Sequence, residues 1–501
     1  MFTGISTRIT LSIFSLGLLG TFGCNKEHVS PRAPLAATAS QAATQAQPTV
    51  KFRSNHYIII ASGDRLPANF TADAKRANGT VTSLLGEAGL AVATSDDPRF
   101  ADKAGRIAGV RSVINDVSFQ AFDGQHERAV ALPASHGGYY SENAYSNPFL
   151  PFQWGLTAVQ APAAWNAGAQ GQGVVVADLD TGFDLTHPDL QPNVIGSVSF
   201  VTLPGEDQDA QHRSPSYSHG THTAGTIAAA NNNLGVIGVA PKAKLLLVKV
   251  LSDAGQGSFS WLMNGIVYAA DHGADVINMS LMAALPRNGK YLDEQGRVIN
   301  NTKATQELVV ALNKATGYAR KRGVTLVASV GNDGNDGNKD QSWIRIPADA
   351  TGVIAIAATG PVGWGKATQT TNLDRFASYS NFGTPAVMFA APGGDFSYPD
   401  FSETTTMFGY YMPTYAMDMV LSTDKDGSYS WLAGTSMAAP HASGIAALVI
   451  GQHGGQLDPA RVEAILRASA DDLGKPGRDP YYGYGRLNAY RAVSQARYAT
   501  R

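Results

Sequence analysis

Cysteine is almost absent from this chain of 501 residues, whose only cysteine is Cys24 near the N-terminus. A single thiol cannot form a disulfide within the chain, so other interactions must stabilise the fold. A large excess of one charge is absent too, because 38 Lys and Arg residues stand against 40 Asp and Glu residues. Without a strongly basic balance, the composition gives no reason to expect binding to nucleic acid. The 44% of hydrophobic residues is ordinary for a globular protein.

The N-terminus is typical of an exported protein. Arg8 precedes an apolar run over residues 9–20, which is too short to span a bilayer as a mature helix and suits a signal peptide over residues 1–23. Cys24 follows in Thr21-Phe22-Gly23-Cys24, which resembles the lipobox of bacterial lipoproteins, although Thr21 stands where Leu is usual. The resemblance implies an acylated, membrane-anchored Cys24 and an extracellular or outer-membrane location. The alternative is an incidental unpaired thiol.

A tether and a small domain are expected next. Residues 24–50 are rich in Ala, Thr, Gln and Pro with few large apolar residues, which predicts a flexible tether. Residues 51–122 predict a small α+β domain in which strands and helices alternate. Its expected strands are residues 56–61, 90–93 and 113–122, and its expected helices are residues 72–85 and 98–107. The polar linker that follows, residues 123–148, is an exposed place for cutting.

The remainder, residues 149–501, is long enough for one large domain. Its short apolar runs alternate with helical patterns, which predicts a doubly wound α/β fold: a parallel sheet with helices on both faces. Buried strands are expected at residues 174–177, 245–250, 276–279, 324–329 and 353–357, and helices at 259–272 and 305–322. Ligands of such sheets bind at the carboxyl ends of the strands, so we expect the chemistry where these runs end.

Three short segments carry residues suited to acyl transfer. The first buried run ends in Asp178-Leu179-Asp180-Thr181-Gly182, where a buried carboxylate could orient an imidazole. His219 begins a helix of small residues, which allows the helix to pack closely on the sheet. Ser436 begins another helix, whose positive N-terminal end favours negative charge at the serine. The first segment alone is a weak signal, because an Asp-x-Gly strand end is more often a turn.

In this order the segments closely resemble the subtilisin family of serine proteases, and the similarity runs over residues 153–488. The resemblance implies a subtilisin-like endopeptidase in which His219 serves Ser436 as general base and then as general acid. It further implies that Asp180, and not Asp178, holds the imidazole.

The resemblance extends to the oxyanion hole and to the N-terminal domain. Asn332 matches the asparagine of the family's oxyanion hole, with the backbone N–H of Ser436 as the second donor. Residues 51–122 resemble the family's inhibitory propeptide of the I9 type, which implies a precursor that removes this domain itself. The alternative for residues 51–122 is an unrelated small binding domain.

Substrates are expected to bind as an added strand. The resemblance implies that a protein or peptide substrate pairs beside Ser280, Leu281 and Met282, close to Gly331. The family usually has glycine where Met282 and Ala283 stand. These side chains are therefore expected to crowd the substrate backbone or to lean into the primary pocket.

The expected cofactor is a structural calcium ion, because Ca²⁺ prefers carboxylate and carbonyl oxygens in a rigid loop. The residues that match a calcium site common in the family are Asp189, Asn232 and the carbonyls of Ala230, Leu234 and Val236. The family's glutamine ligand near the chain start is missing, since Leu150 stands at its place.

Other features have plainer interpretations. The three further histidines that stand out match structural or flanking positions of the family, and they are His187, His222 and His441. The acidic run over residues 332–340 lacks the spacing of a calcium-binding EF-hand and predicts a surface loop. Two extra segments, roughly residues 284–302 and 396–418, lengthen the chain. The aromatic side chains of the second could form a substrate wall or cover the core.

Two other functions stay open at this point. One is a narrow processing peptidase, or one coupled to amide ligation, with an altered pocket. The other is a surface binding protein on an inactive protease scaffold. Such a scaffold is expected to have lost one of the residues that catalysis needs, and this chain keeps Asp180, His219, Asn332 and Ser436.

Overall fold

A seven-stranded parallel sheet forms the centre of the large domain in the computed structural model, which describes residues 50–122, 129–132, 145 and 147–498. The strand order is β17–β16–β14–β10–β6–β8–β7, and all neighbours are parallel. The bounds are β6 (Val175–Asp180), β7 (Val194–Ser199), β8 (Lys244–Lys249), β10 (Val276–Met279), β14 (Thr325–Ser329), β16 (Val353–Thr359) and β17 (Phe389–Pro392). The predicted doubly wound fold is confirmed.

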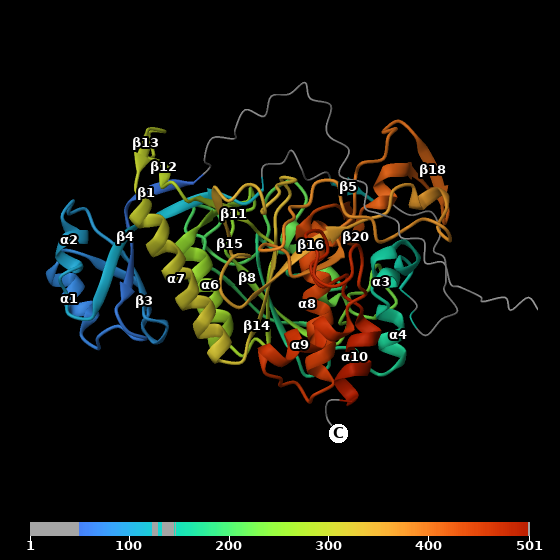
Figure 1. Cartoon of the computed structure of the whole chain (residues 1–501), viewed down its shortest axis with the longest axis horizontal. Coiled ribbons are helices and arrows are strands. Elements are labelled where there is room, and N and C mark those ends of the chain that lie inside the picture. The colour runs from blue at the N-terminus through green and yellow to red at the C-terminus, as the bar shows by residue number, and fades with distance from the viewer. Residues whose placement is uncertain (1–49, 123–128, 133–144, 146, 499–501) are drawn as a thin grey trace, which may run out of the picture. The chain divides into compact units, whose positions relative to one another are not determined.

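Alternate side chains of the strands enter two separate apolar cores, one on each face. Val176 and Leu245 belong to the core that includes helices α5 (His219–Ala228) and α8 (Thr435–Gly451). Their neighbours Ala177 and Leu246 belong to the core that includes α6 (Phe259–Asp271) and α7 (Thr302–Lys321). Helices α6 and α7 run side by side over their face (Figure 1). Burial on both faces explains why the strand segments are continuously apolar.

The N-terminal domain is a mixed sheet with two short helices. Strand β1 pairs antiparallel with β3 and with β4, and β2 pairs antiparallel with β3. The bounds are β1 (Lys51–Ala61), α1 (Phe70–Arg76), β2 (Thr80–Leu85), β3 (Leu90–Thr94), α2 (Phe100–Ala104) and β4 (Val110–Gln120).

The helix predicted over residues 72–85 is wrong in its second half, which forms strand β2. Helix α1 ends because Asn78 takes a left-handed φ of 73°, and the N–H of Gly79 turns back to the Ala74 carbonyl at 2.9 Å. Thr80 and Val81 then begin a run of residues that includes several β-branched side chains, which favour a strand.

Each of the two extra segments contains a hairpin. The first holds β12 (Lys290–Leu292) and β13 (Val298–Asn300), and the second holds β18 (Thr404–Met407) and β19 (Tyr410–Pro413). The remaining helices and strands are β5 (Val130–Ala131), α3 (Trp154–Ala158), α4 (Ala161–Asn166), β9 (Gln256–Ser258), β11 (Ala283–Pro286), β15 (Trp343–Ile346), β20 (Val420–Thr423), β21 (Tyr429–Leu432), α9 (Pro459–Ser469) and α10 (Ala489–Tyr498). Among the described residues, no helix combines the length and the apolar character needed to cross a membrane.

Candidate active site

The predicted catalytic side chains come from one edge of the sheet. Asp180 is the last residue of β6, and His219 is the first residue of α5. Ser436 is the second residue of α8, and Ser280 directly follows β10. Because the strands are parallel, their carboxyl ends meet at this edge, and the sheet order changes direction around β6.

Asp180 and His219 form a buried hydrogen-bonded pair. Nδ1 of His219 lies 2.7 Å from Oδ1 of Asp180, and both side chains are almost completely buried. The N–H of Thr181 donates to the same carboxylate oxygen at 2.6 Å. This contact fixes the tautomer in which Nε2 carries the lone pair, which is what a general base needs.

Asp178 lies beside this pair without contacting the imidazole in any described hydrogen bond. It accepts hydrogen bonds from Asn278 and from Thr223, each at 2.8 Å. Burial, together with the charge of the neighbouring Asp180, raises the pKa of Asp178 well above its usual range. Of the two carboxylates, only Asp180 contacts the His219 imidazole in the described hydrogen bonds.

Ser436 is held at the N-terminus of α8, where the helix dipole is positive. Its hydroxyl donates to the Ser280 carbonyl at 3.1 Å, while the Ser280 hydroxyl donates to the Ser436 carbonyl at 2.7 Å. The Asn332 side chain accepts hydrogen bonds at Oδ1 from the N–H and the hydroxyl of Thr435, at 2.9 and 2.8 Å. This arrangement turns the Nδ2 donor of Asn332 toward Gly434, next to the serine.

Three residues of the β20 strand and the turn after it bind helix α5, and motif reading missed them. The Asp424 carboxylate accepts the N–H of Ser218 at 2.7 Å. The Thr423 hydroxyl donates to the Thr221 carbonyl at 2.6 Å, and Ser422 donates to the His222 carbonyl at 2.8 Å. Since β21 leads directly to Ser436, one hairpin fixes both the histidine helix and the approach to the serine. No local sequence pattern indicates this contact, because its partners are far apart in sequence.

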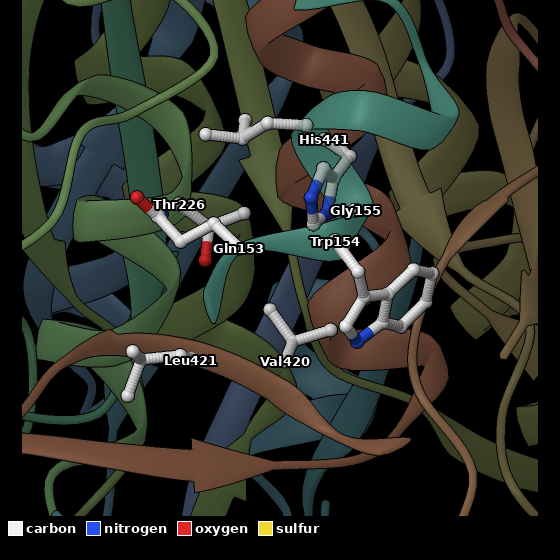
Figure 2. A pocket seen from close by; sticks show the side chains of 8 residues that line it. Gln153, Trp154, Gly155, Thr226, Val420, Leu421 and His441 are labelled. Atoms are coloured by element: carbon white, nitrogen blue, oxygen red, sulfur yellow. The ribbon is translucent and has the colours of Figure 1, made fainter. Parts of the chain in front are cut away.

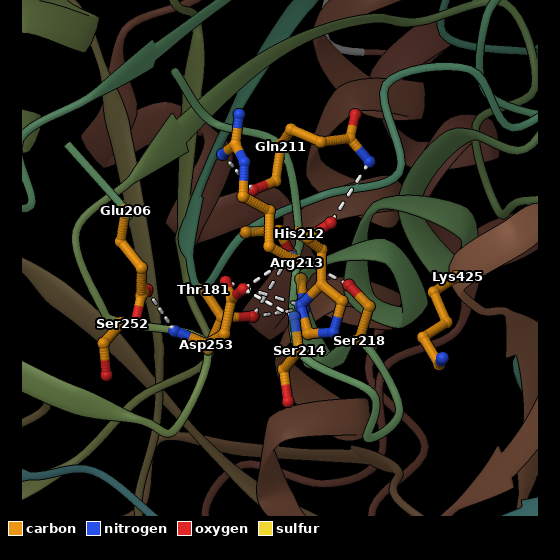
Figure 3. Close-up of polar contacts among 12 residues, drawn as sticks. Thr181, Glu206, Gln211, His212, Arg213, Ser214, Ser218, Ser252, Asp253 and Lys425 are labelled. Atoms are coloured by element: carbon orange, nitrogen blue, oxygen red, sulfur yellow. Dashed lines mark hydrogen bonds and ion pairs between the residues drawn. The ribbon is translucent and has the colours of Figure 1, made fainter. Parts of the chain in front are cut away.

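A second missed group is a charged cluster beside the end of β8 (Figure 3). The fully buried Lys249 forms ion pairs with Asp253 and with Glu206, and Nδ1 of His212 lies 3.4 Å from Asp253. Burial acts to raise the pKa of Asp253, but the hydrogen bond to His212 and the charge of Lys249 hold it far below its ordinary value. The same carboxylate accepts the N–H of Arg213 at 2.6 Å. It thereby anchors the loop that precedes His219.

The last strand of the N-terminal domain lies along this site. Strand β4 pairs antiparallel with β9, with Ser118 opposite Ser258. The chain continues so that the N–H of Ala121 donates to the Gly255 carbonyl at 2.9 Å. The Phe122 ring then covers the His219 imidazole, with ring centroids 4.1 Å apart. The end of this domain therefore occupies a face of the predicted catalytic histidine.

The residues predicted to bind substrate follow the carboxyl ends of β10 and β14. Leu281 is fully buried in the core, whereas Met282 is partly exposed. A side chain added at Gly331 would lie 2.5 Å from the terminal methyl of Met282, so the methionine covers this glycine. Gly331 has a φ of 97°, which also favours glycine. The expectation that Met282 narrows the pocket stays a prediction.

The three other histidines that stand out in the sequence have structural partners. His222 is fully buried and contacts the carbonyls of Val420 and Ser430, at 3.0 and 3.1 Å, and burial lowers its pKa to about 3. His441 contacts the Met437 carbonyl at 2.8 Å, and burial lowers its pKa to about 4.

A small cavity lies beside His441, and Figure 2 shows Trp154 and Val420 on its wall. Its volume of about 10 Å³ corresponds to a single water, which excludes a substrate. The third histidine, His187, accepts the N–H of Asp189 at 3.1 Å.

The predicted calcium ligands form an oxygen-lined cage, and the side chain of Asn147 points into it. Nδ2 of Asn147 contacts four oxygens: the carbonyls of Ala230 (3.1 Å), Leu234 and Val236 (2.6 Å), and Oδ1 of Asn232 (3.4 Å). An NH₂ group has two hydrogens and cannot satisfy four acceptors. Oδ1 of Asn147 is buried and has no hydrogen-bond partner among the described residues. Such a crowd of oxygens fits a cation.

Asp189 closes the cage with its carboxylate. It accepts the N–H of Val236 and the hydroxyl of Tyr429, each at 3.0 Å, and burial raises its pKa. Asn147 was missed because it stands three residues before Leu150, where the family's ligand was sought.

Comparisons with known proteins identify one family. The family model described as the subtilase family matches residues 171–485. Thermitase from Thermoactinomyces vulgaris is 33% identical over 346 residues, which cover 69% of this chain and 97% of thermitase. Subtilisin E from Bacillus subtilis (strain 168) is 35% identical over 340 residues, which cover 68% of this chain and 71% of subtilisin E.

Solved structures agree on the fold. The structure of the epidermin leader peptide processing serine protease from Staphylococcus aureus superposes with a TM-score of 0.66 at 24% identity. The match covers 88% of this chain and 98% of that one. A match over 88% of the chain is longer than residues 149–501, so it extends beyond the large domain.

Proposed function

The chain belongs to the subtilase family and is a subtilisin-like serine endopeptidase, and from this premise we propose that it hydrolyses peptide bonds through an acyl-enzyme on Ser436. The observation that carries the proposal is the buried 2.7 Å contact between Asp180 and His219 at the sheet edge from which Ser436 is also presented.

Each group has a role that follows from its position. Asp180 orients the imidazole and stabilises its protonated form. His219 takes the proton of the Ser436 hydroxyl as the serine attacks the substrate carbonyl, and gives it to the leaving amine. Nδ2 of Asn332 and the N–H of Ser436 receive the developing oxyanion. In subtilisin, loss of such a side-chain donor costs about 2.7–4 kcal/mol of activation free energy.

The proposal includes a precursor that is cut by its own active site. The N-terminal domain, residues 51–122, acts as an inhibitory propeptide, residues 123–148 are the processing linker, and residues 149–501 are the peptidase. Support comes from the pairing of β4 with β9 and from Phe122 over His219, because this arrangement keeps other chains out. Release of the domain then opens the site.

Ser436→Ala tests both parts of the proposal. This variant should accumulate as a folded, uncut precursor, whereas the wild type should yield a shorter species. Ser443→Ala, two turns further along α8, controls for loss of a buried hydroxyl and should still be cut. Cutting of purified Ser436→Ala at the wild-type rate, with no other protease present, would refute Ser436 as the nucleophile and self-processing with it.

Export with a lipid anchor on Cys24 is a further part of the proposal. Residues 1–49 lie outside the described residues, so the support is the apolar run and the lipobox-like segment alone. Cys24→Ser should move the protein from the membrane fraction to the soluble fraction. Unchanged partitioning would remove the anchor.

One structural calcium ion completes the proposal. Asp189, Asn232 and the carbonyls of Ala230, Leu234 and Val236 would hold it, and rotation of the Asn147 amide would add Oδ1 as a ligand. Calcium binding is measured by calorimetry on the Ser436→Ala chain after its metal has been removed with a chelator. Asn147→Ala should weaken the binding, whereas Asn231→Ala, at an exposed residue of the same region, should leave it unchanged. Absence of calcium binding in the parent chain would contradict the site.

A restricted specificity is the second candidate, and the position of Met282 over Gly331 favours it. A methionine there shortens the space available to a large side chain of the substrate. Cleavage profiling of a peptide library should show a preference for small residues before the cut bond, which Met282→Gly should broaden. A broad preference in the parent enzyme would favour a general endopeptidase.

A further inference from the structure

The first extra hairpin pairs with the N-terminal domain and not with the parallel sheet. Strand β12 pairs with β13 and with β1, where Lys51 stands opposite Leu292 in a parallel register. The N–H of Leu292 donates to the Val50 carbonyl at 3.3 Å. The hairpin thereby extends the sheet of a domain from which it is separated by more than 150 residues of sequence.

Side chains on both partners complete this contact. The rings of Phe52 and Tyr291 lie 4.6 Å apart. Tyr291 is fully buried, and its hydroxyl lies 2.7 Å from that of Thr305 at the start of α7. Val50 is fully buried in the same apolar core as Tyr291. The backbone N–H of Ser54 donates to the Glu294 carboxylate at 2.8 Å.

This contact lies directly beside the strand that blocks the site. Lys51 pairs with Leu292 on one side and with Ser118 of β4 on the other. Ser118 in turn pairs with Ser258 of β9. The strands therefore form a continuous series β9–β4–β1–β12–β13, in which the N-terminal domain supplies β4 and β1, and β13, β12, β1 and β4 can be followed in Figure 1.

We propose that the β12–β13 hairpin is an exosite that retains the N-terminal domain, through residues 50–54, after the linker has been cut. This role rests on the proposed self-processing. Hydrolysis of one peptide bond consumes one water and leaves a new carboxylate and a new amine, but it changes neither of the two strand pairings. The cut domain stays attached through its packing on helices α6 and α7, through the cleft strand β9 and through the exosite.

An additional attachment point on one rigid domain makes rebinding at that point intramolecular, which can strengthen retention by about 10²–10⁴ over the other contacts alone. The enzyme is therefore cut first and becomes active later, when the domain leaves. The hairpin sets the length of that delay. After release, β12 is left with an open edge that fits a strand carrying an aromatic residue at the position of Phe52.

The test is a substitution in the N-terminal domain, because the mature enzyme that remains after release of this domain is then chemically unchanged. Phe52→Ala removes the aromatic contact with Tyr291. Ile107→Ala is the matched control, since Ile107 packs only against the core of the N-terminal domain itself. The cutting of the precursor is followed on denaturing gels, and the bound domain is followed by size exclusion after the active site has been blocked with a fluorophosphonate.

We expect Phe52→Ala to be cut at the wild-type rate and to lose the bound domain about tenfold faster, since an aromatic pair with its buried area exceeds the 1.4 kcal/mol that tenfold requires. Adding Tyr291→Ala to Phe52→Ala should accelerate release no further. Equal release from Phe52→Ala and wild type would overturn the exosite, and so would equal acceleration by Ile107→Ala. A wild-type precursor that is never cut would overturn the self-processing, and the exosite with it.

Discussion

The two extra hairpins differ in what they contact. The aromatic-rich hairpin β18–β19 packs on its own domain: Met407 and Met412 are buried in the main core, and Tyr410 contacts Phe149 and Phe152. The hairpin β12–β13 leaves Val298 and Ile299 of its outer strand exposed. Its inner strand pairs with another domain.

Aromatic content alone therefore misleads about function. Of the rings around β18 and β19, Phe408 and Tyr410 contact Phe152 near the start of the large domain, whereas Tyr411 is largely exposed. The segment with a single aromatic residue, Tyr291, is the one that contacts the N-terminal domain. The role of an inserted hairpin depends on which strand edge lies next to it. The tertiary fold determines that neighbour.

The largest expected effect tests the difference in burial between the two hairpins. Met412→Ala removes a side chain that is 2% exposed, so it should lower the free energy of unfolding of the large domain by about 2–5 kcal/mol. Val298→Ala, at a residue 57% exposed, should change it by less than about 0.5 kcal/mol. Urea unfolding in the Ser436→Ala background, followed by tryptophan fluorescence, measures both. Similar losses would mean that the two hairpins are equally part of the folded core.

The next effect concerns how the contact between the N-terminal domain and helix α7 depends on pH. Glu307 of α7 accepts hydrogen bonds from Arg111 at 3.0 Å and from Ser112 at 2.6 Å. Burial acts to raise its pKa, but these hydrogen bonds and the charge of Arg111 outweigh burial and lower it below the ordinary 4.5. Since the bound state then holds the proton more weakly than the free state, binding is favoured above pH 4.5 and lost as pH falls through the lowered pKa.

Retention of the cut domain should therefore weaken several-fold in acid, and Glu307→Gln should flatten this dependence. Size exclusion of the inhibited complex across pH 3.5–7 measures it without using activity. Lys321→Gln is the control, because its ion pair with Asp64 is largely exposed and screened. An unchanged acid response in Glu307→Gln would assign the sensitivity to other groups of the contact.

Sequence reasoning succeeded for the fold, because the buried runs of the parallel sheet are continuous in sequence. The assignment of Asp180, His219 and Ser436 as catalytic residues stays a prediction. Sequence reasoning failed at residues 80–85, where positive-φ Asn78 breaks a helical pattern. Asn147 and Asp424 could not be found, because their roles depend on partners more than 80 residues away.

The smallest expected effect compares the two contacts of the exosite, the Phe52–Tyr291 pair and the hydrogen bond between Ser54 and Glu294. The Glu294 carboxylate accepts one N–H, that of Ser54, in an exposed position. Water replaces such a hydrogen bond readily, so its loss is worth a fraction of a kcal/mol. Glu294→Gln keeps an oxygen acceptor and removes only the charge, so it should shorten retention of the cut domain by less than about twofold.

Gln295→Ala is the matched control for this substitution, because its side chain contacts only Arg297 of the same hairpin in the described hydrogen bonds. Both variants are compared with Phe52→Ala in one size-exclusion series. A Glu294→Gln complex that dissociates as fast as Phe52→Ala would mean that a charged hydrogen bond, and not the Phe52–Tyr291 pair, is the main contact. The hairpin would then select its strand by a backbone N–H, which any sequence offers, and the distinction between the two hairpins would rest on position alone.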